Sequence, residues 1–361
     1  MSSIDSASGP GEPGVNGRAA AARVEPGAIP GEPGAYATRV AAVISAFRPD
    51  PALIGHCASL APQVSRVIVV DDGSGEAAEP VLTALEEAGV VVLRQGENLG
   101  IAAAMNRGIA EAASPSDPSA SRAEFVVTFD QDSEVPQGFI GALVDEHDRA
   151  SRAGLRVGMV APEFFSSTPQ TRMRQRRGFL EAYAPIQSGL LMPLEAIEQL
   201  GPQRDDYFID LVDTEYYLRA RRAGYEALCA PGLVLPHGFG HRLYVHLLGK
   251  RLRKRDGRPR MVAVSSPFRY YYRARNRIVL HREYGRDDPE LRKLLRRDAL
   301  NDAVLDYGVA VWSARGKLAL VSLILAGWRD GRRGRMGRMP AALARRSSKV
   351  SWKHPVPKDA A

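Results

Sequence analysis

The chain has 361 residues, 45% of them hydrophobic, which is enough to bury the core of one large domain or two moderate ones. Its net charge is +8, and it contains only two cysteines, Cys57 and Cys229, on apolar segments. We expect both to be buried free thiols rather than a disulfide, as is usual for intracellular proteins.

The first segment, residues 1–35, is rich in Gly, Pro, Ala and Ser and almost lacks large apolar side chains. Such a composition predicts a disordered leader, because too little apolar surface is present to form a core. The segment has neither the basic start nor the apolar centre of a secretory signal peptide.

Short apolar runs alternate with helical patterns in the next part of the chain. The predicted strands are 40–46, 66–70, 90–93 and 125–128, and the predicted helices are 51–60, 76–88 and 101–113. This alternation predicts crossover units and a parallel α/β sheet. No G-x-G-x-x-G follows the first strand, so the dinucleotide-binding fingerprint is excluded.

Polar loops follow three of these strands. Asp71 and Asp72 follow the second strand, Asn98 follows the third, and Asp130 and Asp132 follow the fourth. Ligands bind at the carboxyl edge of such sheets, so the pattern indicates a nucleotide crevice.

Asp130 and Asp132 are one residue apart, so they face the same point only if the strand ends between them. Ser133 and Pro136 supply residues typical of a turn. Two carboxylates at one point suit Mg²⁺ or Mn²⁺ shared with nucleotide phosphates. A loop with two solvated acids is the alternative.

Further along, strands are predicted at 156–162 and 187–192 and a short helix at 194–200. A longer helical pattern starts at Asp210 and ends at Gly224, a typical helix-terminating residue. Asp210, Asp213 and Glu215 crowd at its start. Crowded carboxylates raise one another's pKa, which suits a general base, although helix capping alone explains one of them.

Five segments in order carry a resemblance: VDDGS, ENLGIAAAMNRGI, FDQDS, QSGLL and FIDLVDTEYYLRARRAGY. Together they resemble glycosyltransferase family 2, whose members are inverting enzymes with the GT-A fold. FDQDS, FIDLVDTEYYLR and the later FRYYYRARNRIVL are most similar to bacterial rhamnosyltransferases of cell-surface polysaccharide synthesis. The resemblance spans about 38–338. It implies a GT-A catalytic domain at 36–245, with a Rossmann-like, mostly parallel sheet flanked by helices. A basic helical extension at 246–340 and a flexible tail at 341–361 complete the expected organisation.

The resemblance also implies the donor-binding residues. Asp71 would hold the base or ribose, with Asp72 as its substitute. Phe47 stands where relatives carry a tyrosine that packs on the nucleobase. The other residues implied at the nucleotide-sugar are Asn98, Gly100, Asn106, Asp130, Gln131 and Arg275. Arg275 belongs to an R-x-Y-Y-x-x-R-N block that contacts the phosphates or orders a lid over them.

For the chemistry, the resemblance implies Asp213 as the catalytic base, with Asp210 and Glu215 beside the acceptor or behind the base. Asp132, Asp130 and His237 would hold Mg²⁺ or Mn²⁺, with Asp132 the closest ligand. The implied reaction moves L-rhamnose from dTDP-rhamnose to a glycan or polyprenyl-linked acceptor. Galactose and galactofuranose are alternative sugars of the same family.

Two other classes stay open. A sugar-phosphate nucleotidyltransferase needs a glycine-rich phosphate loop after the first strand, and residues 45–50 contain no glycine. A non-catalytic nucleotide-sugar binding module on the same fold is the second.

Charge is unevenly distributed. Residues 1–241 contain 19 basic and 31 acidic side chains, whereas residues 242–361 contain 30 basic and 10 acidic. This asymmetry indicates an anionic partner, and nucleic acid is not expected because no binding motif accompanies the charge. The apolar run 317–328 is too short to cross a bilayer but suits its interface, with arginines on the headgroups. We expect a cytoplasmic protein, peripheral at the inner face of the cell membrane; a helix packed on the catalytic domain is the alternative.

Overall fold

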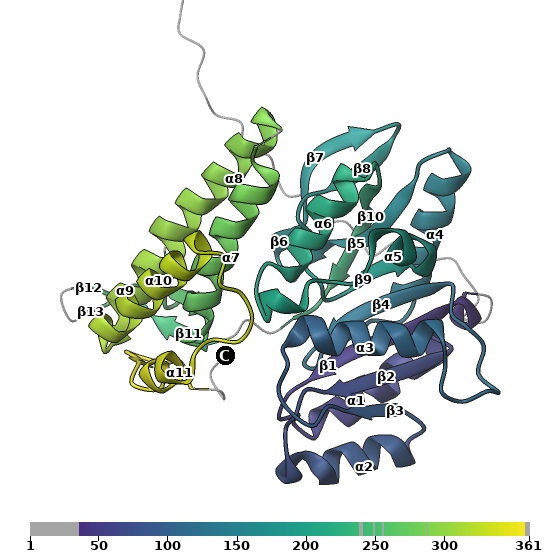
Figure 1. The fold of residues 1–361 in the computed structure, drawn as a ribbon, viewed down its shortest axis with the longest axis horizontal. Coiled ribbons are helices and arrows are strands. Elements are labelled where there is room, and N and C mark those ends of the chain that lie inside the picture. The colour runs from purple at the N-terminus through teal and green to yellow at the C-terminus, as the bar shows by residue number, and fades with distance from the viewer. Residues whose placement is uncertain (1–35, 238–240, 248–249, 255, 287, 358–361) are drawn as a thin grey trace, which may run out of the picture.

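The computed structural model of the protein describes residues 36–237, 241–247, 250–254, 256–286 and 288–357 (Figure 1). The leader expected at 1–35 lies outside the described residues. Within the described part, ten strands form one large sheet in the order β3-β2-β1-β4-β9-β5-β10-β8-β7, with β6 (Thr168–Pro169) paired to β5. Cys57 and Cys229 are buried free thiols, as expected.

The first half of the sheet is parallel, as the alternating pattern predicts. β1 pairs in parallel with β2 and β4, and β2 pairs in parallel with β3. The strands are β1 (Val40–Ala46), β2 (Arg66–Asp71), β3 (Val91–Arg94) and β4 (Phe125–Asp130). The crossover helices between them are α1 (Ala52–Leu60), α2 (Glu79–Glu87) and α3 (Ile101–Ala113).

Side chains of β1 alternate between two hydrophobic cores, because successive residues of a strand face opposite sides of the sheet. Val40 and Ile44 belong to a core completed by α1, α2 and α4 (Phe139–Arg152). Ala41 and Val43 belong to a second core that contains α3 and residues of the C-terminal helices. The C-terminal region thus shares a core with the sheet.

The second half of the sheet is mixed. β9 (Leu190–Pro193) runs antiparallel to both β4 and β5 (Val157–Phe165), whereas β10 (Glu226–Leu235) is parallel to β5. The predicted strands at 156–162 and 187–192 and the helix at 194–200 are confirmed as β5, β9 and α5 (Leu194–Leu200). A hairpin of β7 (Thr171–Arg176) and β8 (Phe179–Ala182), which the sequence pattern did not indicate, lies at the edge.

The helix predicted from Asp210 begins two residues later, as α6 (Val212–Arg222). Asp210 and Leu211 have φ values of 64° and 63°, a left-handed backbone that a right-handed helix cannot contain. Asp210 therefore precedes the first helical turn, which corrects its expected place, whereas Asp213 lies in that turn. Gly224 follows the helix with φ 80°, as predicted for a terminating glycine.

The C-terminal region is mainly helical, as expected. Its strands pair locally: β11 (His241–Tyr244) with β14 (Met261–Val264), β12 (His246–Leu247) with β13 (Lys250–Arg251), and β15 (Ala314–Arg315) with β16 (Ser351–Trp352). The helices α7 to α10 stack beside the sheet (Figure 1). The bounds of these helices are α7 (Arg269–Tyr284), α8 (Pro289–Asn301), the π-helix η5 (Asp302–Tyr307), α9 (Gly308–Ser313) and α10 (Lys317–Arg332). A short helix, α11 (Ala341–Ser347), follows them.

The apolar run at 317–328 lies in α10, which packs along α7. Leu320 and Leu323 are fully buried there, and Gly327 lets the helices approach, since a Cβ at this position would lie 2.2 Å from the carbonyl oxygen of Tyr271. The opposite face exposes Leu318 and Trp328. The helix is therefore packed on one side and apolar on its free side. Among the described helices, none is long and apolar enough to cross a membrane.

Candidate active site

A cavity of about 1410 Å³ opens at the carboxyl edge of the parallel strands, between the sheet and the C-terminal helices. Its walls come from the ends of β1 and β4, the start of α6, and one face of α7. Most of the residues expected to bind the donor gather here. Those that line the cavity are Phe47, Asp72, Asn98, Gly100, Asp130, Gln131, Asp132, Asp210, Asp213 and His237.

Phe47 and Gln131 lie together where β1 and β4 end. The backbone N–H of Phe47 donates to Oε1 of Gln131 at 2.8 Å, which fixes the turn after β1. Phe47 is 40% exposed, which is high for a large aromatic residue. An exposed ring of this kind is suited to stack on a planar ligand.

Of the two acids after β2, Asp72 lines the cavity and Asp71 does not. The Asp72 carboxylate accepts hydrogen bonds from the backbone N–H groups of Leu99 (2.7 Å) and Gly100 (3.0 Å), and burial raises its pKa despite them. Asp71 instead accepts from the backbone and hydroxyl of Ser74. Of the two acids, Asp72, expected only as a substitute, is therefore the one that the structure places at the cavity.

Asn106 is the second expected donor residue outside the cavity. Its side-chain amide donates to the carbonyl oxygen of Gln203 at 2.8 Å and accepts from the Gln203 N–H at 2.9 Å. These two bonds tie α3 to the segment before α6. Asn106 itself does not line the cavity, and its expected place beneath the donor stays a prediction.

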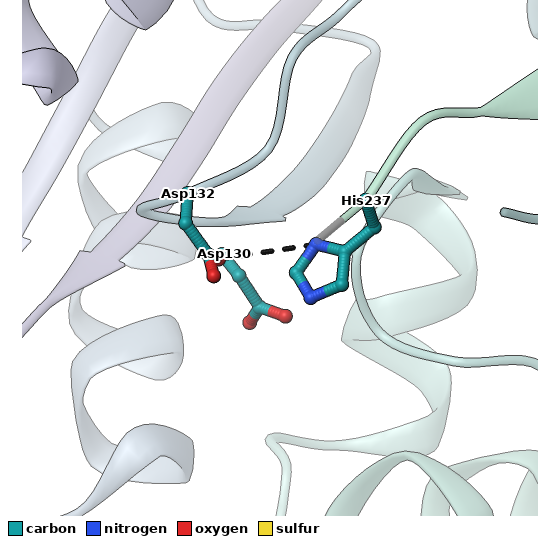
Figure 2. Close-up of side chains that lie close together, drawn as sticks. All are labelled: Asp130, Asp132 and His237. Atoms are coloured by element: carbon teal, nitrogen blue, oxygen red, sulfur yellow. Dashed lines mark ion pairs between the residues drawn. The ribbon is translucent and has the colours of Figure 1, made fainter. Parts of the chain in front are cut away.

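Asp130, Asp132 and His237 form a cluster able to hold a metal ion, since one ligand atom from each lies within 4.8 Å of the others. Figure 2 shows their side chains pointing toward one another from two different segments. An isolated β-bridge between Ser133 and His237 joins the segment after β10 to the turn after β4. The sequence implies a metal-ligand role for His237 only through the family resemblance. In the structure, this bridge explains how His237 comes close to the two aspartates.

The chemistry of this trio fits a divalent cation. Nδ1 of His237 is buried and has no hydrogen-bond partner among the described residues. Burial and the neighbouring Asp132 raise the pKa of Asp130 to about 6, so its charge is poorly compensated. A cation bound by two carboxylates and one imidazole would satisfy both groups, and Mn²⁺ and Mg²⁺ accept such ligands.

Asp213 and Asp210 differ in their charged partners. The Asp213 carboxylate accepts from the backbone N–H groups of Thr214 (2.7 Å) and Gln187 (3.3 Å), and burial raises its pKa. Burial alone would raise the pKa of Asp210 too, but ion pairs with Arg269 (2.6 Å) and Arg273 (3.1 Å) outweigh it and hold that pKa low. Asp213 is therefore the better proton acceptor.

Glu215 and Arg275 are buried and do not line the cavity, so the structure does not bring either side chain to a position of direct contact with a ligand there. Their other expected places, Glu215 behind the base and Arg275 in a block that orders a lid, stay predictions. Glu215 is 1% exposed, accepts from the hydroxyl of Tyr284 at 2.7 Å and forms an ion pair with Arg219 at 2.9 Å. Arg275 is fully buried, and its guanidinium donates to backbone carbonyl oxygens of the segment before α6.

Arg269, Arg273 and Arg277 form a basic stripe on the face of α7 that lines the cavity. Their four-residue spacing is visible in the sequence and places them on one side of a helix. In the R-x-Y-Y-x-x-R-N block, Arg269 is the first motif residue, whereas Arg273 occupies a variable position and Arg277 follows the block. The motif alone therefore does not mark Arg273 and Arg277 as cavity residues. Arg273 and Arg277 form ion pairs with Asp306 and Asp302 of η5.

A strained turn precedes Asp213. Phe208 has φ 66° and ψ −61°, and the carbonyl oxygen of Tyr207 accepts from the N–H of Ile209 at 2.8 Å. These values define a classic γ-turn, which is rare and strained. Asp210 and Leu211 follow in left-handed conformations. Non-glycine residues in such conformations cost about 1–3 kcal/mol each, so surrounding contacts must hold them.

Comparison with known proteins finds similarity to one family over part of the chain. Residues 43–196 match the family model described as Glycosyl transferase family 2. The dTDP-rhamnosyl transferase RfbF of Shigella flexneri is 27% identical over 258 residues, which cover 68% of this chain and 81% of that protein.

Solved structures share less with the chain. A 4-diphosphocytidyl-2C-methyl-D-erythritol synthase is 14% identical and covers 55% of this chain and 88% of its own, with a TM-score of 0.35. The inositol-1-phosphate CTP transferase from T. maritima is 15% identical and covers 55% and 86%, also with a TM-score of 0.35.

Proposed function

We propose that the protein is an inverting, metal-dependent glycosyltransferase. In the proposed reaction it moves L-rhamnose from dTDP-rhamnose to a hydroxyl of a glycan or lipid-linked acceptor. The match of residues 43–196 to glycosyl transferase family 2 and the α/β architecture, which is that of the GT-A fold, support this proposal. The observation that carries this proposal is the presence of the Asp130, Asp132 and His237 cluster and the Asp213 carboxylate in one cavity. The similarity to RfbF supports rhamnose as the sugar.

On the donor side, the nucleobase would stack on Phe47, with Asp72 and Asn98 near the base and ribose. Asp132, Asp130 and His237 would hold Mg²⁺ or Mn²⁺ beside the diphosphate. When bound there, such a cation neutralises the charge that develops on the leaving nucleoside diphosphate.

The chemical step is a single displacement at the anomeric carbon. The acceptor oxygen forms a bond to this carbon while the bond to the diphosphate oxygen breaks, and Asp213 takes the hydroxyl proton. Burial strengthens Asp213 as a base by raising its pKa. Since the acceptor attacks opposite the leaving group and no covalent enzyme intermediate forms, the anomeric configuration inverts.

The acceptor would occupy the part of the cavity along α7. The cavity volume of about 1410 Å³ exceeds the roughly 300–1,000 Å³ typical of a pocket for one small ligand. Beyond Asp213 it is walled by Arg273, Arg277, Asp302 and Asp306. In this proposal residues 36–245 bind the donor, and residues 246–340 supply the α7 wall.

The free face of α9 and α10 supports a membrane partner. This apolar face comprises Trp312, Leu318, Leu325 and Trp328, whose exposed fractions are 45–88%. Lys317 and Arg332 place their charged groups 5.3 and 4.5 Å from the Trp312 and Trp328 ring centres. Tryptophans and basic groups side by side favour the interface of an anionic bilayer, so we place the protein at the cytoplasmic face of the cell membrane.

The purified protein incubated with dTDP-rhamnose tests the function. Transfer to an acceptor, or slow hydrolysis to dTDP and rhamnose, should require Mg²⁺ or Mn²⁺. Release of UDP from UDP-galactose or UDP-galactofuranose, with no release of dTDP from dTDP-rhamnose, would replace the sugar assignment. Formation of pyrophosphate from a sugar phosphate and nucleoside triphosphate would contradict glycosyl transfer and indicate a nucleotidyltransferase. Binding of dTDP-rhamnose without any turnover would indicate a binding module.

A further inference from the structure

The strained segment before α6, residues 206–211, joins the donor side of the cavity to the candidate base, and we term it the base loop. At one end, the carbonyl oxygen of Phe208 accepts from the N–H of Ile101, the first residue of α3. At the other end the base loop continues directly into the α6 turn that carries Asp213. The conformation of this loop therefore sets the position of the base relative to the donor.

Asn276 holds the loop through its backbone oxygens. Its side chain is fully buried on α7, and Nδ2 lies 2.7 Å from the carbonyl oxygen of Asp210, 3.0 Å from that of Ile209 and 3.2 Å from that of Tyr207. Three carbonyl groups converge on one amide only when the intervening residues adopt the tight, left-handed path described above. Asn276 thus recognises the strained conformation itself.

Arg275 holds the start of the same loop. Nη2 donates to the carbonyl oxygens of Asp206 (3.0 Å) and Tyr207 (2.8 Å), and Nε donates to Oδ1 of Asn276 at 2.9 Å. The remaining nitrogen, Nη1, donates to the carbonyl oxygen of Gly337. Burying a guanidinium costs free energy unless its N–H groups are all hydrogen-bonded. Arg275 therefore depends on the carbonyl oxygens of the base loop as much as the loop depends on Arg275.

The segment after α10 closes this arrangement from the other side. The N–H of Gly337 donates to the carbonyl oxygen of Asp206 at 2.7 Å, and the N–H of Met339 donates to the hydroxyl of Tyr272 at 2.8 Å. Tyr272 in turn stacks on Phe208, with ring centres 4.9 Å apart. The base loop is therefore held between α7 and this C-terminal segment.

We propose that Arg275 and Asn276 are positioning residues, which hold the base loop in its strained conformation and so aim Asp213 at the acceptor hydroxyl without touching either substrate. The proposal rests on the proposed function for the role of Asp213. It separates the R-x-Y-Y-x-x-R-N block into two faces of α7: Arg269 and Arg273 face the cavity, and Arg275 and Asn276 face the base loop.

Asn276→Asp is the first test, because it preserves side-chain size and the acceptor for Arg275 but removes both N–H donors. We expect kcat to fall about 100-fold, the loss typical of a misplaced catalytic group, while the KM for dTDP-rhamnose changes by less than about twofold. Amide hydrogen exchange in residues 207–211 should accelerate about tenfold, with β1 and β4 unchanged.

Tyr284→Phe is the matched control. It removes a buried hydrogen bond between α7 and Glu215 of α6 but leaves the base loop untouched. It should leave both kcat and exchange in residues 207–211 unchanged. Arg275→Lys, which keeps the charge but loses the forked geometry, is the second variant should Asn276→Asp fail to fold, and it should give a smaller kcat loss in the same direction.

Normal turnover in folded Asn276→Asp or Arg275→Lys protein would overturn the proposal, as would exchange that accelerates equally in both the variant and the Tyr284→Phe control. The exchange experiment needs no substrate. Selective acceleration of exchange in residues 207–211 would therefore support the role of Arg275 and Asn276 in holding the base loop, whether or not the wild-type protein transfers rhamnose. Failure of the wild-type protein to transfer rhamnose would overturn only the proposed function.

Discussion

Oδ1 of Asp132 and Nδ1 of His237 lie 3.9 Å apart, although one residue follows β4 and the other follows β10. The Asp132 side chain is 65% exposed and the His237 side chain 15%, so one group faces the solvent and the other is already enclosed. A cation would draw the exposed carboxylate toward the enclosed imidazole. This difference makes Asp132 the member of the cluster that can be altered with the least harm to the fold.

Asp132→Ala should abolish transfer and the metal-dependent part of dTDP binding while leaving unfolding unchanged, because an exposed side chain contributes little to stability. Calorimetric titration with dTDP in the presence and absence of Mn²⁺ measures the effect. Glu134→Ala, an exposed acid two residues away and outside the cluster, is the matched control. Metal-dependent dTDP binding that survives in Asp132→Ala would show that the ligands have been assigned incorrectly.

Asp213→Asn should bind donor normally and lose about 10²- to 10⁴-fold in turnover, the usual contribution of a general base. The amide retains the shape of the side chain but cannot take the hydroxyl proton. Donor affinity and kcat are measured separately, by titration and by initial rates. Retention of most of the turnover would make Asp213 a helix-capping residue and direct attention to Asp210.

The pH dependence of kcat should reveal the same group. Asp213 must be ionised to accept a proton, and burial raises its pKa, so kcat should fall as the pH decreases through a value above the ordinary aspartate pKa of about 3.9. The fall in kcat at low pH should disappear in Asp213→Asn, because this variant has no carboxylate at position 213 to protonate. A fall that persists unchanged in this variant would belong to another group.

Gly100→Ala should weaken donor binding and destabilise the protein by about 1–3 kcal/mol, because φ is 97° and a Cβ would lie 2.5 Å from the carbonyl oxygen of Phe208. Gly89→Ala is a control with φ 82° and no atom within 4 Å of the added Cβ, so it introduces the backbone strain alone. Urea unfolding and the KM for dTDP-rhamnose separate the two effects. Equal KM values in both variants would contradict a role for the Gly100 and Phe208 contact.

Leu318→Asp and Trp328→Asp should reduce sedimentation with vesicles containing anionic lipid, and high salt should release the wild-type protein. Both side chains are exposed, so the fold should tolerate the changes. Met173→Asp, at an apolar side chain exposed elsewhere, is the matched control. Equal binding of the wild-type protein to neutral and anionic vesicles, or no binding to either, would leave α10 as a packing helix.

The order and type of the elements up to Asp130 could be predicted from the sequence because local pattern determines them. Runs of Val, Ile and Ala buried on both faces identify central strands, and the polar residues after them identify the ligand-binding edge. The candidate metal acids and Asp213 followed from this edge together with the family resemblance.

Other features depend on contacts between distant segments and leave no local signal. The γ-turn at Phe208 contains no glycine, so no residue in the sequence marks it. Hydrogen bonds from Arg275 and Asn276 of α7 stabilise it instead. The choice between Asp71 and Asp72 depends on which carboxylate Ser74 engages and which meets the backbone of Gly100. The residue types of the R-x-Y-Y-x-x-R-N block do not by themselves show which of its side chains face the cavity and which face the base loop.

The contact between Arg275 and Gly337 determines which residues must be transferred together when segments are exchanged between related proteins. The family match ends at residue 196, but the segment that encloses the base loop extends to Met339. A chimera that joins the sheet of one enzyme to the helices of another would pair a base loop with a foreign α7. An exchange of C-terminal regions should therefore transfer residues 206–339 as one block, so that the base loop and the residues that hold its conformation stay together.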